Sequence, residues 1–206
     1  PYQPLIDPAI KAVTKVTEKS SAAKKAAIDK SIHFFDDFSS TAINEKPIGW
    51  FSEGNSVGSH AFVTNVRGEE GKWMVTRGNT LTPLTLVKPL PINFSLSFNV
   101  AVPRGFTWGA KSLEWVISTE TKEREGGEYI SFKMRPGFDG RAGSSDITTH
   151  LKGIGRDSYK YGEAPGFSNN KDFNRVTVMI RKKDSDLLVF FDGQPMKELS
   201  LQVPPS

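Results

Sequence analysis

The residues best suited to chemistry in this chain are aromatic rings in stretches rich in glycine and polar residues. Sugars bury their C–H faces on aromatic rings while polar side chains bind their hydroxyls, on loops or concave faces that are largely pre-formed. Trp108 lies in a glycine-flanked stretch where an indole is difficult to bury, and Tyr159 and Tyr161 occupy alternate positions in a polar stretch. These residues indicate a carbohydrate-binding site. The side chains that donate hydrogen bonds to the sugar hydroxyls are expected among the arginines Arg104, Arg135 and Arg156.

Each of these aromatic residues also has a structural interpretation. A ring in a loop can fold down onto the domain and close it as a plug, without contacting any ligand. The other three tryptophans lie in or next to predicted strands, and we assign Trp50, Trp73 and Trp115 to the core.

The alternative functions are glycoside hydrolysis of a polysaccharide and a purely structural module that tethers another domain. The carboxylates give hydrolysis little support. Retaining hydrolysis needs two carboxyl groups about 5 Å apart. The nearest candidates, Glu114 and Glu120, would lie about 20 Å apart along a strand. Glu114 is therefore predicted to be a solvent-facing strand residue. His33, His60 and His150 lie in separate predicted strands without metal-ligand spacing, so no catalytic set and no required cofactor are predicted.

The elements that must position these residues are β-strands. Residues 92–102 alternate without a break, with an apolar residue at every even position. Residues 174–193 predict two strands joined by a polar turn, and the second, Leu187–Phe191, is apolar throughout, as in a strand covered on both faces. Asp192-Gly193 predicts a tight turn into a further strand.

The rest of the body has the same character. Strands are predicted at 32–39, 60–66, 72–77, 80–87, 113–119, 128–135 and 146–152, with Pro83 confining its strand to an edge or bulge. Residues 153–170 are predicted to form a long loop carrying the two tyrosines. We therefore predict an all-β fold, a two-sheet antiparallel jelly-roll sandwich.

Residues 1–31 form a different organisational unit, rich in lysine and alanine. Asp7-Pro8 suits a helix start, and Ile10, Val13 and Val16 recur at a spacing of three. We predict a short helical leader at 1–31 and a sandwich domain at 32–206. A membrane-surface helix is the alternative, but this apolar stripe lacks Trp, Phe and Leu.

Composition excludes several classes of function. The chain of 206 residues has no cysteine, which rules out disulfides and thiolate metal sites, and no apolar run long enough to span a membrane. Residues 1–33 hold six lysines and three acidic residues, so they carry three of the four net positive charges. With a nearly neutral body and no aromatic-basic motif, nucleic acid is not an expected partner. A start at Pro1, without Met, is expected of a mature form or of a piece cut from a longer chain.

Several of these stretches together resemble a known family. Phe34-Phe35-Asp36-Asp37-Phe38-Ser39, Pro47-Ile48-Gly49-Trp50, the alternating 94–102 strand and the 174–193 hairpin are similar to concanavalin A-like, laminin-G-like jelly rolls. The nearest likeness is to a domain of Bacteroidetes cell-envelope proteins, in which an outer-membrane-protein-A-like peptidoglycan-binding domain often follows. The resemblance covers residues 32 to about 200. It implies a periplasmic, cell-surface or secreted location and a glycan-binding or adhesive role, with a glycan or envelope polysaccharide as partner.

The same resemblance suggests one metal site. Sandwich proteins that bind glycans often hold Ca²⁺ where their terminal strands meet, and carboxylates are the hard oxygen ligands that this ion prefers. Asp36 and Asp37, beside the first predicted strand, would then pair with Asp192 near the closing hairpin. The alternative is that these three aspartates are turn and strand-end residues.

Overall fold

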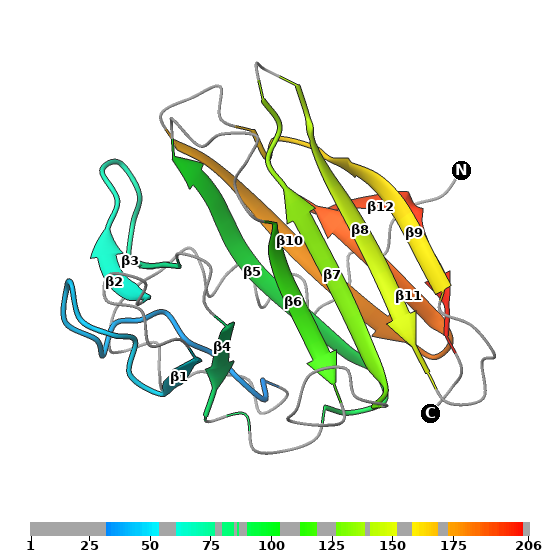
Figure 1. The fold of residues 1–206 in the computed structure, drawn as a ribbon, viewed down its shortest axis with the longest axis horizontal. Helices are drawn as coiled ribbons and strands as arrows, with labels where there is room; N and C mark the ends of the chain where they lie inside the picture. Colours follow the sequence, from blue (N-terminus) through cyan, green and yellow to red (C-terminus); the bar gives the residue numbers. More distant parts are fainter. Residues whose placement is uncertain are drawn as a thin grey trace. The chain divides into compact units, whose positions relative to one another are not determined.

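The computed structural model describes residues 32–53, 61–76, 80–84, 86, 90–103, 112–118, 127–138, 141–151, 158–168 and 173–203 (Figure 1). This part of the chain is all-β, with antiparallel strand pairs and no helix, so the predicted fold class is confirmed at this level. The predicted helical leader at 1–31 lies outside the described residues. None of the described residues belongs to a helix that could cross a membrane. The strands are β1 Trp50–Glu53, β2 Phe62–Asn65, β3 Lys72–Val75, β4 Thr80–Pro83, β5 Phe94–Pro103, β6 Leu113–Ser118, β7 Tyr129–Arg135, β8 Gly143–His150, β9 Ser158–Ala164, β10 Phe173–Lys183, β11 Asp186–Phe191 and β12 Gln194–Gln202.

The chain divides into two compact units, Pro1–Leu90 and Pro91–Ser206. The first unit contains two separate antiparallel ribbons, β1 with β4 and β2 with β3. The β2–β3 hairpin joins the strands predicted at 60–66 and 72–77, and Gly68 and Gly71 in its turn both have positive φ. Pro83 is the last residue of β4, as a residue without an amide proton should be in a strand.

The strand predicted at 32–39 is wrong, because local hydrogen bonds hold this stretch in turns. The carboxylate of Asp36 accepts a hydrogen bond from the Phe38 amide at 2.7 Å, and that of Asp37 accepts one from the Ser39 amide at 2.9 Å. Phe38 itself has a φ of 57°. Aspartate side chains that bind the backbone two residues on favour turns over strands.

The second unit contains two four-stranded sheets that enclose the core (Figure 1). One has the order β12-β11-β10-β5, and the other is the meander β6-β7-β8-β9. Although far apart in sequence, β5 and β10 pair along ten residues. In the sequence, the four strands of the meander thus lie between β5 and β10, which pair with each other in the opposite sheet. These two layers with apolar side chains between them form a β-sandwich.

The core follows the predicted alternation. Val176, Val178 and Ile180 of β10 are at most 1% exposed. On β5, Phe98 stacks on Trp115 of β6, with ring centres 3.9 Å apart. The even residues of β5 and the apolar residues of β7 complete this cluster. The assignment of Trp115 to the core is confirmed.

The hairpin predicted from 174–193 is present as β10 and β11, and the turn that follows leads into β12. Asp184, Asp192 and Gly193 have positive φ, as two-residue hairpin turns require. Strand β11 is mostly buried on both faces. Leu187, Val189 and Phe191 pack in the core cluster on one face, and Arg181 covers the Phe190 ring at 4.9 Å on the other.

The long loop predicted at 153–170 is wrong over most of its described length. Residues 158–164 form β9, which pairs with β8 over seven residues. It is an edge strand of the meander, with Tyr159, Lys160 and Tyr161 exposed in succession. An edge strand exposed on both faces lacks the alternation of apolar residues from which strands are predicted.

Candidate functional site

The meander has one apolar face and one polar face. Its apolar side chains belong to the core cluster, and the residues between them point away from it because strand side chains alternate. We call this second surface the outer face. Directly paired residues lie on the same side of a sheet, and the register assigns to the outer face Glu114, Val116, Ser118, Tyr129, Ser131, Lys133, Arg135, Ser144, Asp146, Thr148, His150, Tyr159, Tyr161 and Glu163.

Three residues predicted for the carbohydrate site, Tyr159, Tyr161 and Arg135, lie on this face. Tyr159 is 57% exposed and Tyr161 is 60% exposed. Alternate positions on one strand put their rings on the same side, about 7 Å apart along β9. The alternative that they fold down as plugs is wrong, since plugs would be buried. Arg135 ends β7, where it is exposed.

Tyr161 belongs to a row of paired residues that crosses all four strands. In register, Glu114 on β6 is opposite Lys133 on β7, Lys133 is opposite Asp146 on β8, and Asp146 is opposite Tyr161 on β9. Neighbouring strands are about 4.8 Å apart, so an aromatic ring and alternating charges succeed one another across the sheet. This combination can bind a sugar by stacking and by hydrogen bonds to its hydroxyls.

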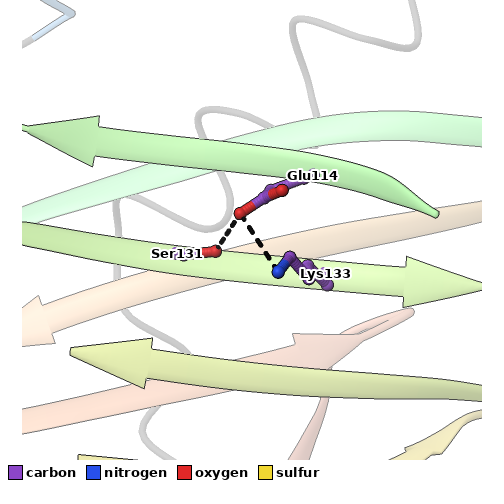
Figure 2. A network of polar contacts seen from close by, with 3 residues as sticks. All are labelled: Glu114, Ser131 and Lys133. Atoms are coloured by element: carbon purple, nitrogen blue, oxygen red, sulfur yellow. Dashed lines mark hydrogen bonds and ion pairs between the residues drawn. The ribbon is translucent and has the colours of Figure 1, made fainter. Parts of the chain in front are cut away.

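The acidic end of this row is held in a small polar network (Figure 2). Ser131 Oγ donates a hydrogen bond of 2.6 Å to Glu114 Oε1, and Lys133 Nζ lies 3.5 Å from the same oxygen. Ser131 is buried, while the side chains of Glu114 and Lys133 are about a quarter to a third exposed. Two partners on one carboxylate oxygen hold Glu114 against β7. The prediction that Glu114 is on the solvent side of its strand is confirmed.

The carboxyl group of Asp146 differs in acidity from an ordinary aspartate. Partial burial raises the pKa of its carboxyl above the ordinary value, while Lys133 and Arg135 lower it and Glu114 raises it further. Burial is the largest of these effects, because a desolvated carboxylate loses hydration that nearby cations only partly replace. Asp146 is therefore a carboxyl that binds a proton more readily than an exposed aspartate.

Aromatic rings also lie on the outer face where β7 begins and β8 ends. Tyr129 and His150 are directly paired, and their rings stack with centres 5.5 Å apart and an angle of 12° between the planes. This stack belongs to the neighbouring strands β7 and β8. Aromatic groups thus occur on β7, β8 and β9 of the same face.

Other predicted site residues are not tested by this geometry. Trp108, Arg104 and Arg156 lie outside the described residues. The sequence analysis did not select the stretch Gly54-Asn55-Ser56-Val57-Gly58, although it fits the Gly-x-Ser-x-Gly pattern of a nucleophile elbow. This stretch also lies outside the described residues.

The three aspartates predicted to bind calcium accept hydrogen bonds within their own units. Beside its bond to Phe38, Asp36 accepts one of 2.7 Å from Trp50 Nε1, and Asp192 accepts one of 2.8 Å from the Thr177 amide. Together with the Asp37 turn, these contacts give each carboxylate a structural role. Among the described residues no group of three or more acidic, histidine or cysteine side chains could hold a metal ion. A calcium ion at this place stays a prediction.

The outer face also contains polar residues that the sequence analysis did not select, chiefly Lys133, Asp146 and Glu163. A signal for Lys133 was present, since polar residues alternate with apolar ones through 129–135, but 144–150 contains a single apolar residue, Ile147, and gave no such signal for Asp146. The register that brings these two stretches and β9 side by side was not available from that signal.

Comparison of the chain with protein-family models, with curated proteins and with solved structures found no match.

Proposed function

We propose that this chain is a non-catalytic carbohydrate-binding or adhesive domain of a bacterial cell-envelope protein, and that the glycan binds to the outer face of the meander. The sandwich is proposed to be of the concanavalin A-like jelly-roll type. The location is periplasmic, at the cell surface or secreted, in line with the resemblance described above.

One observation carries the binding proposal: two strongly exposed tyrosines lie side by side on a strand, next to charged side chains. Tyr159 and Tyr161 leave more than half of each residue in contact with solvent, and neither side chain forms a hydrogen bond or ring contact with another described residue. The paired strand fixes the backbone that carries both tyrosines, so binding a sugar does not have to order that backbone. Lys133 and Asp146 lie in the same row as Tyr161 and supply hydrogen-bond donors and acceptors.

A glycan array with the purified chain tests this proposal. We expect binding to at least one glycan, reduced by Tyr161→Ala and by Tyr159→Ala. Lys160→Ala is the matched control, because Lys160 is exposed between the two tyrosines but on the other side of β9. If both tyrosine variants bind as the wild type does, the proposed site is wrong.

Glycoside hydrolysis is a second candidate, because the row contains two carboxyl groups, those of Glu114 and Asp146. Glu114 and Asp146 are two strands apart, about 10 Å between their backbones, while inverting glycosidases hold their carboxyls about 6.5–9.5 Å apart. The raised pKa of Asp146 suits a general acid. Against it, Lys133 lies between them and pairs with Glu114. Turnover of an oligosaccharide that is lost in Asp146→Asn and Glu114→Gln would favour the enzyme over the binding domain.

A further inference from the structure

The outer face has an exposed apolar residue that the tyrosine pair does not account for. Val116 on β6 is 49% exposed. In register, Val116 is opposite Ser131 on β7, Ser131 is opposite Thr148 on β8, and Thr148 is opposite Tyr159 on β9. We call these four residues the central row. It crosses the four strands that lie side by side in Figure 1, and it connects Val116 with an exposed tyrosine.

The two ends of the central row differ from its middle. Val116 and Tyr159 at the ends are each about half exposed, whereas the middle consists of two short hydroxyl side chains, of which Ser131 is buried. Neighbouring strands are about 4.8 Å apart, so the two ends are about 14 Å apart. A ligand that contacts both ends must be longer than a single sugar ring and must pass over Ser131 and Thr148.

Polar side chains follow the central row on one side. The row from Glu114 to Tyr161, which we call the charged row, lies two residues further along each strand, or about 7 Å away. Glu114 reaches from it towards the central row, because its carboxylate accepts the hydrogen bond from Ser131 Oγ (Figure 2). A ligand above the central row therefore has hydrogen-bonding groups along one edge.

The charges of this row favour an uncharged ligand. In register, Lys133 lies between Glu114 and Asp146, and its Nζ atom is 3.5 Å from the Glu114 carboxylate. An anionic sugar would meet two carboxylates and one ammonium group that is already paired. A hydroxyl group both donates and accepts hydrogen bonds, so it can bind the ammonium group and a carboxylate together. Sugar hydroxyls thus suit the charged row better than sugar carboxylates do.

Aromatic rings lie on the other side of the central row. Tyr129 is two residues from Ser131 on β7, and His150 is two residues from Thr148 on β8, so their stacked rings are also about 7 Å from the row. The central row is thus bordered by aromatic surface on one side and by hydrogen-bonding groups on the other. A sugar ring has both kinds of surface, apolar C–H groups and polar hydroxyls.

Building on the proposed function, we infer that the outer face binds an uncharged oligosaccharide that lies across the four strands, along the central row. One sugar stacks on Tyr159, the chain passes over the two short side chains, and a later sugar contacts Val116. Hydroxyls along one edge of the chain bind the charged row. The ligand class is therefore an uncharged oligosaccharide, rather than a monosaccharide or a chain of uronic acids.

The test titrates the whole chain with uncharged hexose and N-acetylhexosamine oligosaccharides of one to six units, and with oligogalacturonides of the same lengths, by calorimetry. We expect affinity to rise with length up to at least three units and to be higher for an uncharged series. Val116→Ala removes two methyl groups from the contact, so it should weaken binding of an uncharged tetramer about fivefold and leave the monosaccharide unchanged. Tyr159→Ala should weaken both. Ile92→Ala, which shortens an exposed apolar side chain outside the meander, is the matched control.

NMR spectra of the amides test the orientation of the chain. With the tetramer, amide signals of β6 and β9 should both shift, whereas the monosaccharide should shift those of β9 and not those of β6. A chain that lies along the tyrosines of β9 would instead shift only the signals of β8 and β9. Val116 and Ile92 are both exposed, so the alanine variants should fold, which circular dichroism would verify.

The outcomes separate the two proposals. This inference is overturned, and the proposed function stands, if a glycan whose binding Tyr159→Ala weakens leaves the β6 signals unchanged or binds equally well to Val116→Ala. The same holds if monosaccharides bind as tightly as tetramers or if the oligogalacturonides bind better. If no uncharged probe binds, this inference fails, and the proposed function fails with it unless another glycan on the array binds.

Discussion

The properties of a single residue on the outer face depend on its neighbours on other strands. Asp146 is the best example, since its acidity depends on burial together with Lys133 and Arg135 from β7 and Glu114 from β6. Tyr161 and Glu163 from β9 complete its surroundings. None of these residues is adjacent to Asp146 in the sequence. Substitution of Lys133, Arg135 or Glu114 should nevertheless change the pKa of Asp146, because each of them shifts it in the folded protein.

The raised pKa of Asp146 predicts a pH-dependent stability. Its folded-state pKa lies above that of the unfolded chain, so the folded protein binds more protons between the two values. The free energy of unfolding should therefore fall as pH rises through this interval, with the loss complete above the folded-state pKa. Asp146→Asn removes the titration, so the variant should gain stability relative to wild type as pH rises. Urea unfolding at several pH values measures this difference, and a constant difference would contradict it.

Asp36 should matter for stability through two hydrogen bonds. Its carboxylate holds both the Phe38 amide and the Trp50 indole, and the rings of Phe34 and Phe38 pack on Trp50 at 5.8 and 6.2 Å. Asp36→Ala should lower the free energy of unfolding by about 2 kcal/mol, since it leaves partly buried donors without a partner. Tryptophan fluorescence during urea unfolding would report it. Glu70→Ala, at an exposed position, is the charge control, and an equal effect there would refute the argument.

The same variant tests the calcium prediction by metal removal. If Asp36 acts only through its hydrogen bonds, EDTA should leave the Tm of the wild type unchanged. A Tm that falls with EDTA in the wild type and not in Asp36→Asn would instead identify a calcium site at this aspartate.

At the scale of elements, two positions beside strands require glycine. Gly143 begins β8, and a Cβ atom there would collide with the carbonyl oxygens of Arg135 and Phe167. Gly193 has a positive φ of 79° but open space around it. Both positions require glycine, one for packing and the other for backbone conformation.

Alanine at these glycines should therefore have unequal effects. Gly143→Ala forces backbone atoms apart and should cost about 3 kcal/mol or more, while Gly193→Ala meets only conformational strain of about 1 kcal/mol. Thermal and urea unfolding of the two variants would measure this order. The packing argument fails if Gly193→Ala is the more destabilised protein.

At the scale of the whole molecule, the sandwich has its own core. Among the described residues, every member of the main apolar cluster, from Phe94 to Val203, lies in the unit Pro91–Ser206. We expect residues 91–206 to fold alone, because a domain that buries its own apolar cluster has its own source of stability. Circular dichroism should show β structure and a cooperative thermal transition. A fragment without such a transition would mean that the first unit is required.

The sequence by itself determined the all-β class, the β10–β11 hairpin, the following turn and the apolar side of β5. These depend on alternation and on turn residues, which act over a few neighbouring positions. Only the tertiary structure decided that 158–164 is a strand rather than a loop, and that Tyr161 faces Asp146 and Lys133. The physical reason is that an edge strand is defined by its hydrogen-bonded partner, and that register between strands distant in sequence depends on how both bury their apolar sides in one core.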